Sequence, residues 1–264
     1  MLELRKVYKT FNPGTVNEKR ALNGVDLKLN DGDFVTVIGG NGAGKSTMLN
    51  AVAGVFTVDS GSIIIDDVDV TKLPEHKRAK FIGRVFQDPM MGTAATMGIE
   101  ENLALAYRRG ARRTLRAGIT NKEREFYRQE LKTLGLGLED RMTAKVGLLS
   151  GGQRQALTLL MASIRKPKLL LLDEHTAALD PKTAEKVLQI SDKIVRENNL
   201  TTMMVTHNMR DAIAHGNRLI MMDAGRVVVD ISGEDKKKLT VPDLLALFSR
   251  ASGSDEANDK MLLS

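Results

Sequence analysis

The stretch Gly39-Gly40-Asn41-Gly42-Ala43-Gly44-Lys45-Ser46 fits the pattern G-x-x-x-x-G-K-[ST]. An apolar run at 34–38 precedes it and apolar residues at helical spacing follow it at 48–52, which predicts a strand, a glycine loop and a helix. Glycines let successive backbone N–H groups point at phosphate oxygens, and the helix N-terminus adds partial positive charge. We therefore predict a nucleoside-triphosphate loop, with these binding residues: Gly39, Asn41, Gly42, Ala43, Gly44, Lys45, Ser46 and Thr47. Lys45 would reach the β- and γ-phosphates, and Ser46 would ligate Mg²⁺.

A second segment, Leu169-Leu170-Leu171-Leu172-Asp173-Glu174, reads as a buried strand that ends in two acids. Ligands of open α/β sheets bind at the carboxyl ends of the strands, so both carboxylates are expected beside the phosphate loop. Asp173 is expected to hold Mg²⁺ and Glu174 to orient or deprotonate the attacking water. A strand-terminal Asp-Glu pair alone would be a solvated turn; the phosphate loop in the same chain favours the functional interpretation.

A third segment, Leu149-Ser150-Gly151-Gly152-Gln153, opens a helix and predicts a second phosphate-binding N-terminus in one chain. Together with the loop at 39–47 and the strand into Asp173-Glu174, it resembles the ATP-binding cassette (ABC) ATPases. In that family the serine-glycine segment of one subunit closes over ATP held by the phosphate loop of the other. The resemblance covers residues 2 to 250 and implies ATP and Mg²⁺ as cofactors.

The resemblance implies roles for four more residues. Gln87 corresponds to the glutamine that reaches the metal and water, and His207 to the histidine that contacts the γ-phosphate. Asp180, in Ala178-Leu179-Asp180, corresponds to the loop that couples the two sites of a dimer. Phe11 corresponds to the aromatic that stacks on adenine, with Tyr8 as a rival for that role.

Two positions depart from the usual family pattern. His175 stands where a proline usually follows the glutamate, and Gly40 stands where proline or serine is commoner inside the loop. Neither change removes a ligand, so hydrolysis is still expected, whereas the stiffness of each loop is in question.

The resemblance and the alternation of strands with helices imply an α/β fold. We expect a P-loop NTPase core, a mixed sheet with N-terminal antiparallel strands, and an inserted α-helical subdomain. The expected single ABC ATPase domain spans 1–250, with the core at 1–87 and 165–250 and the helical subdomain, including the serine-glycine segment, at 88–164. Residues 251–264 are polar and small, and a disordered tail is expected there.

Composition excludes several classes of protein. The 264 residues contain no cysteine, which excludes disulfides and thiolate metal sites and fits a reducing compartment. Uninterrupted apolar runs stop at five residues, whereas a membrane-spanning helix needs about 20. The N-terminus lacks an apolar signal-peptide core. A chain that stays in the cytoplasm, on the inner face of the membrane through a permease, is therefore expected.

The family resemblance implies an ATPase subunit of an ABC transporter, most simply a prokaryotic uptake system for a small solute such as an amino acid. The expected partners are a second ATPase subunit, most simply an identical one, integral-membrane permease subunits and an extracytoplasmic solute-binding protein. Two alternatives stay open. One is a soluble cassette ATPase of iron–sulfur assembly or of nucleic acid and ribosomes, and the other is an exporter subunit.

The formal net charge of +6 is concentrated in residues 108–132, which hold nine Arg or Lys and three Glu. Arg108, Arg112 and Arg116 have helical spacing, so a helix would gather them on one side with Arg109 and Arg113. A solvated face and a surface toward anionic lipid or permease loops are both compatible with this basic arm. Nucleic acid is not an expected partner, because no aromatic residues interleave with the arginines.

Overall fold

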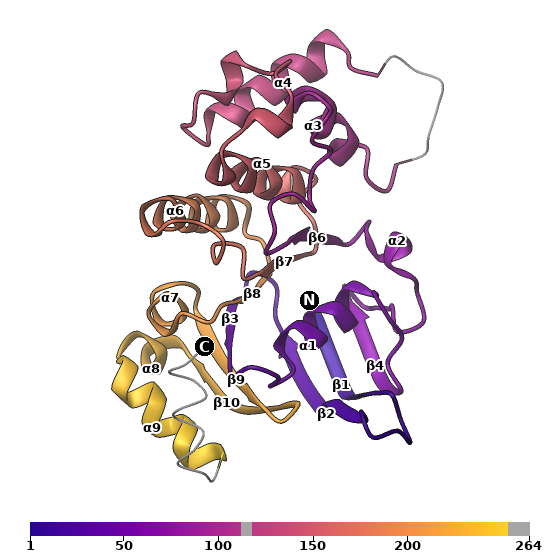
Figure 1. Ribbon diagram of the computed structural model, residues 1–264, viewed down its shortest axis with the longest axis vertical. Helices are drawn as coiled ribbons and strands as arrows, with labels where there is room; N and C mark the ends of the chain where they lie inside the picture. The colour runs from indigo at the N-terminus through magenta and orange to yellow at the C-terminus, as the bar shows by residue number, and fades with distance from the viewer. Residues whose placement is uncertain (112–117, 253–264) are drawn as a thin grey trace.

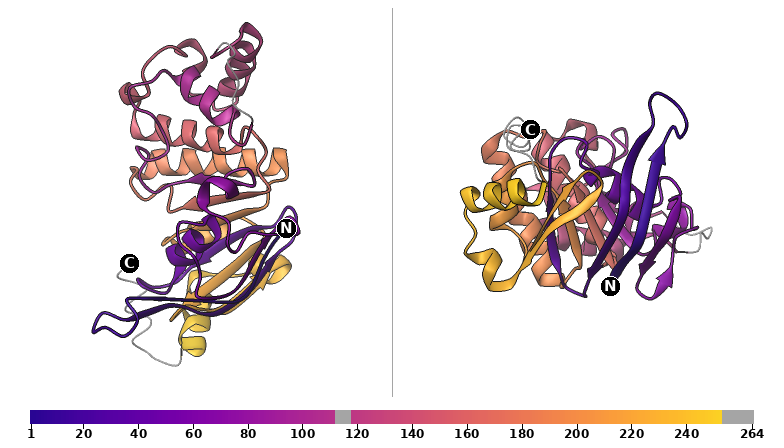
Figure 2. Two further views of the ribbon diagram at one scale, coloured as in Figure 1. Left: turned by 90° about the vertical axis from the view of Figure 1, so that its right-hand side faces the viewer. Right: turned by 90° about the horizontal axis from the view of Figure 1, so that it is seen from below.

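The computed structural model describes residues 1–111 and 118–252. Strands fill the lower part of the molecule in Figure 1, where several helices lie beside them, and a further group of helices gathers above. An antiparallel sheet of order β2-β1-β4-β5 is built from the N-terminal strands β1 (Leu2–Phe11), β2 (Lys19–Leu29), β4 (Ser60–Ile65) and β5 (Val68–Asp69). Figure 2 shows β1 and β2 as a long hairpin, and the connection between the two strands contains Pro13 and Gly14.

The second sheet is mixed and has the order β10-β9-β3-β8-β7-β6. β3, β6, β7, β8 and β9 run parallel to their neighbours, and β10 is antiparallel to β9. The strands are β3 (Phe34–Ile38), β6 (Ile82–Val85), β7 (Leu169–Asp173), β8 (Thr202–Val205), β9 (Arg218–Asp223) and β10 (Arg226–Ser232). The α/β fold with a mixed sheet and antiparallel N-terminal strands is confirmed.

Strand β7 shows why its sequence is apolar throughout. Leu169 and Leu171 pack into the core shared with the antiparallel sheet and the first helix, whereas Leu170 and Leu172 pack against the helices on the other face. A parallel strand that is covered on both faces needs apolar side chains at every position. The strand therefore delivers Asp173 to the edge of the sheet from a fixed position.

The helices in chain order are α1 (Lys45–Ala53), α2 (Glu75–Arg78), α3 (Ile99–Tyr107), α4 (Asn121–Lys132), α5 (Gly151–Ser163), α6 (Pro181–Asn198), α7 (Met209–Ala214), α8 (Gly233–Lys237) and α9 (Val241–Ser252). Two 3₁₀ turns, at Leu138–Asp140 and Val146–Leu148, lie between α4 and α5. The inserted helices α3, α4 and α5 lie between β6 and β7 in the chain and form the top of Figure 1. None of the helices at 1–111 and 118–252 has the length and apolar character of a bilayer span.

Three elements were not expected from the sequence: β5, β10 and α8. The tail expected from residue 251 onward lies outside the described residues, except that α9 extends to Ser252. The division into a core at 1–87 and 165–250 and a helical subdomain at 88–164 stays a prediction.

The basic arm is described only at its two ends, 108–111 and 118–132. Helix α3 ends at Tyr107, and Gly110 has a φ of +74°, which an α-helix does not accommodate. Arg109 donates to the carbonyl of Ala162 on α5 at 3.0 Å. The helix does not run on through Gly110, and Arg112, Arg113 and Arg116 lie outside the described residues, so the gathering of the arginines on one side stays a prediction.

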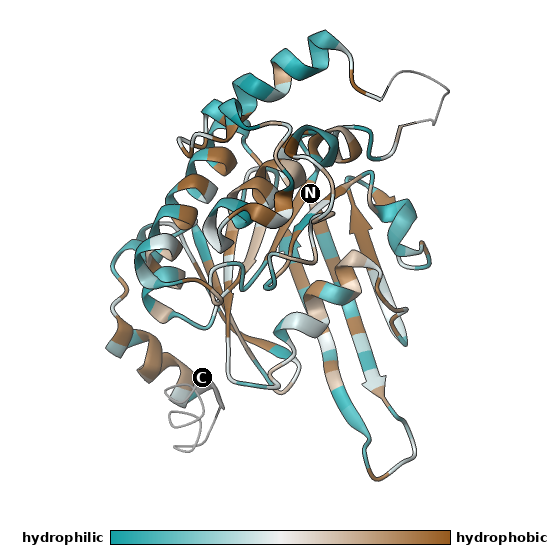
Figure 3. Ribbon diagram, turned by 45° about the horizontal axis from the view of Figure 1, so that its top comes forward, coloured by the Kyte–Doolittle hydropathy of each residue, from teal (hydrophilic) through white to brown (hydrophobic). Residues whose placement is uncertain are grey.

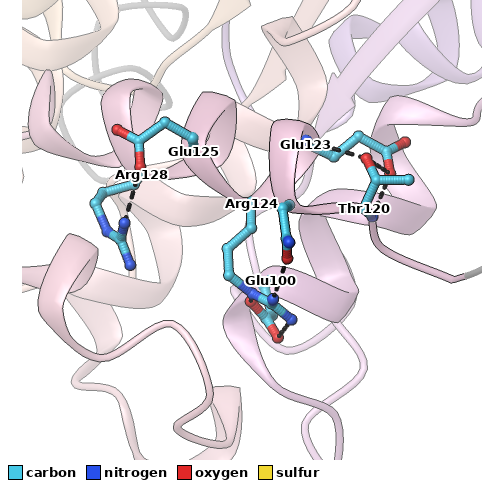
Figure 4. A network of polar contacts seen from close by, with 7 residues as sticks. Glu100, Thr120, Glu123, Arg124, Glu125 and Arg128 are labelled. Carbon is cyan, nitrogen blue, oxygen red and sulfur yellow. Dashed lines mark hydrogen bonds and ion pairs between the residues drawn. The ribbon is translucent and has the colours of Figure 1, made fainter.

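Several charges of this arm are paired within the chain. Arg108 contacts Glu123 at 2.8 Å, and Arg124 contacts Glu100 at 2.7 Å. Figure 4 shows Arg124 reaching Glu100 and Arg128 reaching Glu125, at the surface of α4. Helix α4 is mainly hydrophilic, as Figure 3 shows for the helix after the grey trace, and only Tyr127 and Leu131 of its side chains are buried. These pairs favour a solvated, internally neutralised face for this part of the arm.

Candidate functional site

The phosphate loop connects β3 to α1, as the sequence predicts. Gly44 is the N-cap residue of α1 with a φ of +103°, and no side chain caps this end of the helix. A Cβ at Gly44 would lie 2.6 Å from the carbonyl oxygen of Ala21, so only glycine fits there. The first N–H groups of α1 are therefore left for a ligand, which is the arrangement that binds a phosphate.

The ammonium of Lys45 is folded against its own loop. Its Nζ donates to the carbonyl oxygens of Gly39 at 2.6 Å and Gly40 at 3.2 Å, and the side chain is buried. Burial lowers the pKa of Lys45, and the nearby carboxylates of Glu174 and Asp173 oppose this shift. Desolvation strengthens the attraction of this charge for an incoming phosphate.

The turn between β9 and β10 braces the loop from the other side. The N–H of Gly225 donates to the carbonyl of Ala43 at 3.0 Å, and the carbonyl of Gly225 accepts from the N–H of Asn23 at 2.9 Å. The sequence analysis did not select Gly225. The sequence did contain a signal for this turn, because Asp223-Ala224-Gly225 is typical of a turn and the valines at 227–229 after it are typical of a strand.

The structure brings Asp173, Glu174 and His207 together at the carboxyl ends of β7 and β8. His207 Nδ1 lies 3.6 Å from Glu174 Oε2, and both side chains are partly exposed. Glu174 has a left-handed backbone with a φ of +43°. Because these strands are parallel neighbours, the sheet edge places the expected water-activating carboxylate and the expected γ-phosphate contact side by side.

Arg84 on β6 is a site residue that the sequence analysis missed. Its Nη2 lies 3.1 Å from Asp173 Oδ2 and 2.6 Å from Asn50 Oδ1 on α1. Burial raises the pKa of Asp173, and the Arg84 guanidinium partly opposes that shift. Arg84 was detectable only from the parallel pairing of β6 with β7, which puts it directly across from Leu171.

A cavity of about 680 Å³ adjoins this edge and contains both Asp173 and Gln87. Its lining also includes Arg84 and Asn50, together with the apolar side chains of Val55, Phe86 and Met91. Gln87 follows directly after β6 and so shares a cavity with the acid from β7. The two residues expected to reach one metal therefore face the same space.

Phe11 and Tyr8 occupy different environments on β1. Phe11 packs edge-to-face on Phe56, with ring centroids 5.3 Å apart, and pairs in register with Lys19 on β2. The Lys19 ammonium lies 3.2 Å from the point where a Cβ on Gly42 would stand, so this end of the hairpin adjoins the phosphate loop. Tyr8 instead packs over Gly24. Phe11 is therefore the better placed of the two beside a bound nucleotide.

The serine-glycine segment lies apart from the phosphate loop, since α5 and α1 are well separated in Figure 1. Ser150 is the N-cap of α5: its Oγ accepts from the N–H of Gln153 at 3.3 Å, and Gln153 Oε1 accepts from the Ser150 N–H at 3.2 Å. Leu149 is buried beneath it. Asp180 caps α6, since its Oδ1 accepts from the N–H of Thr183 at 3.1 Å. Hydrogen bonds from the Thr183 side chain and from its N–H hold the pKa of Asp180 below its usual value.

A family model described as "ABC transporter" matches residues 22–177, more than half of the chain. The match includes the phosphate loop, the serine-glycine segment and Asp173-Glu174. The chain belongs to the ABC transporter ATPases. It is therefore an ATP-binding and ATP-hydrolysing cassette, as the sequence analysis expected.

Individual members of the ABC family extend this result. A tyrosine transport ATP-binding protein of Clostridioides difficile is 44% identical over 95% of this chain and all of that protein. A spermidine/putrescine import ATP-binding protein of Haemophilus influenzae is 34% identical over 87% of this chain, which spans only 57% of that protein. A dimeric ATP-binding cassette, MJ0796, bound to ADP and Pi is 30% identical, with a TM-score of 0.74 over 88% of this chain and 98% of its own.

Proposed function

We propose that this ABC cassette powers the import of a small solute, and that the solute is an amino acid of the tyrosine class. The relative from Clostridioides difficile, which is named for tyrosine transport, is matched over its full length. Relatives named for spermidine/putrescine and methionine import match as well. Import is favoured over the exporter and soluble alternatives on these grounds.

In the proposed hydrolysis, water attacks the γ-phosphorus in line with the bond to the β-phosphate oxygen, and ADP leaves with that electron pair. Glu174 takes the proton of the attacking water. Lys45 and the N–H groups of the phosphate loop stabilise the charge on the transferred group. His207, 3.6 Å from the Glu174 carboxylate, contacts the γ-phosphate from the end of the neighbouring strand β8.

Ser46, Asp173 and Gln87 would hold Mg²⁺. Hydroxyl, carboxylate and amide oxygens suit this ion, which is commonly bound by one or two carboxylates together with substrate phosphates. Across residues 1–111 and 118–252, no three His, Cys, Asp or Glu side chains cluster as a metal site of their own. Asp173 is the one carboxylate among the three proposed ligands, which fits a metal that arrives with the nucleotide. Bound Mg²⁺ would supply neutralisation of the phosphate charge.

Two cassettes would pair so that Leu149, Ser150, Gly151, Gly152 and Gln153 of each subunit cover the ATP held by the other, with Asp180 linking the two sites. We propose a homodimer that works at the inner face of the membrane on permease subunits, supplied by a solute-binding protein. Exposed apolar side chains support a permease contact: Met90 and Met91, close to Gln87 in the chain, are 51% and 68% exposed, and Leu148, next to the serine-glycine segment, is 73% exposed. Residues 88–164 would form the helical subdomain that carries this surface.

The pairing of Glu174 with His207 beside Lys45 carries the proposal for the reaction. Replacing Glu174 by Gln keeps the shape but removes the proton acceptor, so ATP turnover should fall on the order of 10³-fold while ATP binding is kept. Turnover is measured by phosphate release and binding by nucleotide fluorescence. Glu185→Gln, a matched change on the exposed face of α6, should leave both unchanged. Turnover of Glu174→Gln at the wild-type rate would refute the assignment.

A separate experiment tests import. Reconstituted with its permease in vesicles, the protein should hydrolyse ATP faster when a solute-binding protein loaded with tyrosine is added outside. Stimulation by nucleic acid, or pairing with a soluble partner only, would favour the non-transport alternative.

A further inference from the structure

The turn that follows β7 holds Glu174 in an uncommon conformation. A φ of +43° in a residue with a side chain costs free energy and persists only where surrounding contacts fix it. Two backbone hydrogen bonds contribute: the Glu174 N–H donates to Val205 on β8, and its carbonyl accepts from Ala177, both at 3.0 Å. Neither bond restrains the turn from the side of α6.

The next residue, His175, supplies that restraint. Its side chain is buried, and its Nε2 lies 3.0 Å from the Oγ of Ser191, which is also buried on α6. The Ser191 hydroxyl donates to the carbonyl of Val187 at 2.9 Å, so Nε2–H is the donor toward Ser191.

Helix α6 contacts other parts of the proposed machinery. Asp180 caps its N-terminus. The serine-glycine segment packs on its first turn, because a Cβ at Gly152 would lie only 2.1 Å from Thr183 Cγ2. The segment that acts on the partner's ATP and the turn that carries Glu174 thus rest on one helix, the first at Thr183 and the second at Ser191.

We propose that His175 is a positioning residue for Glu174, and that it sets the turn by its hydrogen bond to Ser191 on α6. A proline at this position restrains the backbone through its ring alone. In this chain the hydrogen bond between His175 and Ser191, which we call the tether, restrains the backbone instead. The position of Glu174 therefore depends on the position of α6. The inference rests on the proposed role of Glu174 as the acceptor of the water proton.

Three variants test the tether in the full-length protein. His175→Leu and Ser191→Ala remove its two ends, and each should lower kcat about tenfold or more, because small misplacements of a reacting group are costly. The KM for ATP and the Kd of a fluorescent ATP analogue should stay within twofold of wild type. His175→Gln keeps an N–H donor at similar reach and should recover most of kcat.

Ser163→Ala is the matched control. Ser163 is a buried serine on α5 whose hydroxyl donates to Leu159 and Leu160 in the same manner as Ser191 to Val187, and no histidine depends on it. It should lower the melting temperature about as much as Ser191→Ala while leaving kcat unchanged.

The outcomes separate the inference from the proposed function. A lowered melting temperature with kcat unchanged in both His175→Leu and Ser191→Ala would show a purely structural contact and overturn the proposal. Equal loss of kcat in His175→Gln and His175→Leu would also overturn it. If Glu174→Gln itself kept turnover, the proposed function would fail, whereas loss in Glu174→Gln with none in the tether variants would refute the tether alone.

Discussion

Two helix N-termini in this chain are built in opposite ways. At α1 the N-cap is Gly44, in a left-handed conformation and without a side-chain cap, so the first N–H groups are open. At α5 the N-cap is Ser150, which forms a reciprocal capping box with Gln153. The first end is prepared for a ligand in the isolated subunit, while the second is already satisfied by its own side chains.

The difference indicates how binding is divided between two subunits. An open helix end with a buried lysine attracts ATP without any partner. A capped end gains from a phosphate only when a second subunit presents one, because the capping bonds must be exchanged for contacts to the ligand. The phosphate loop should therefore govern affinity in the monomer, and the serine-glycine segment should govern turnover in the dimer.

The largest expected effect is that of Lys45→Ala. Removing the ammonium that lies against Gly39 and Gly40 should weaken ATP binding by the isolated subunit about 100-fold or more, since a charged contact to phosphate is lost. Titration with a fluorescent ATP analogue measures this. An unchanged affinity would break the contrast between the two helix ends. Lys19→Ala, a nearby exposed lysine, is the matched charge control and should have a smaller effect.

Mixed dimers test the division directly. Ser150→Arg should block the covering segment while leaving monomer affinity for ATP unchanged, and Lys45→Ala should block the loop. Neither homodimer has an intact site, but mixing the two variants creates one, from the loop of the first and the segment of the second. Mixing should therefore restore a substantial fraction of ATP turnover.

The double variant Lys45→Ala/Ser150→Arg is the control for this experiment. Mixed with wild type it forms hybrid dimers in which neither site is complete, so the hybrids should be inactive. Absence of rescue in the first mixture, together with active hybrids in the second, would mean that each subunit completes its own site.

Adenine recognition should belong to the loop side alone. Phe11→Ala should weaken ATP binding about tenfold, because stacking of a base on an aromatic ring contributes about 1–3 kcal/mol. Tyr8→Ala, on the same strand but packed over Gly24, should change affinity less than twofold. The reverse ranking, in the same fluorescence titration, would reassign the stacking residue to Tyr8.

Much of this architecture could be predicted because its signals are local. The helix at Ile99–Tyr107 and the starts of α4, α5 and α6 follow from spacing, caps and a proline at the first helical position. The phosphate loop and the acids after β7 could be predicted because each has a fixed spacing and a fixed neighbouring strand. Strand β10 was missed although the turn at Asp223-Ala224-Gly225 precedes its valines.

Other features depend on contacts between distant segments. Arg84 approaches Asp173 only because β6 pairs with β7, 89 residues further along the chain. The burial of His175 against Ser191 depends on how α6 packs over the sheet. Patterns within one element do not contain this information.

The smallest expected effect concerns the contact between the N-terminus of α5, at Gly152, and Thr183 on α6. Gly152→Ala would place a methyl group 2.1 Å from Thr183 Cγ2, so α5 and α6 must separate, at a cost of about 1–3 kcal/mol in the free energy of unfolding. Gly151→Ala, whose Cβ would lie 3.3 Å from Leu179 Cδ2, needs only a small adjustment and serves as the control. Both are measured by denaturant unfolding.

Adding Thr183→Ala to Gly152→Ala removes the clashing methyl group and should recover most of the lost stability, whereas adding it to Gly151→Ala should not. If the two substitutions show no interaction free energy in this double-mutant cycle, the serine-glycine segment packs less closely on α6 than the contact at Gly152 implies. The capped end would then move independently of α6. With strong coupling, any shift of the covering segment over a partner's ATP must displace Thr183, and with it the helix that Asp180 caps and that holds Ser191.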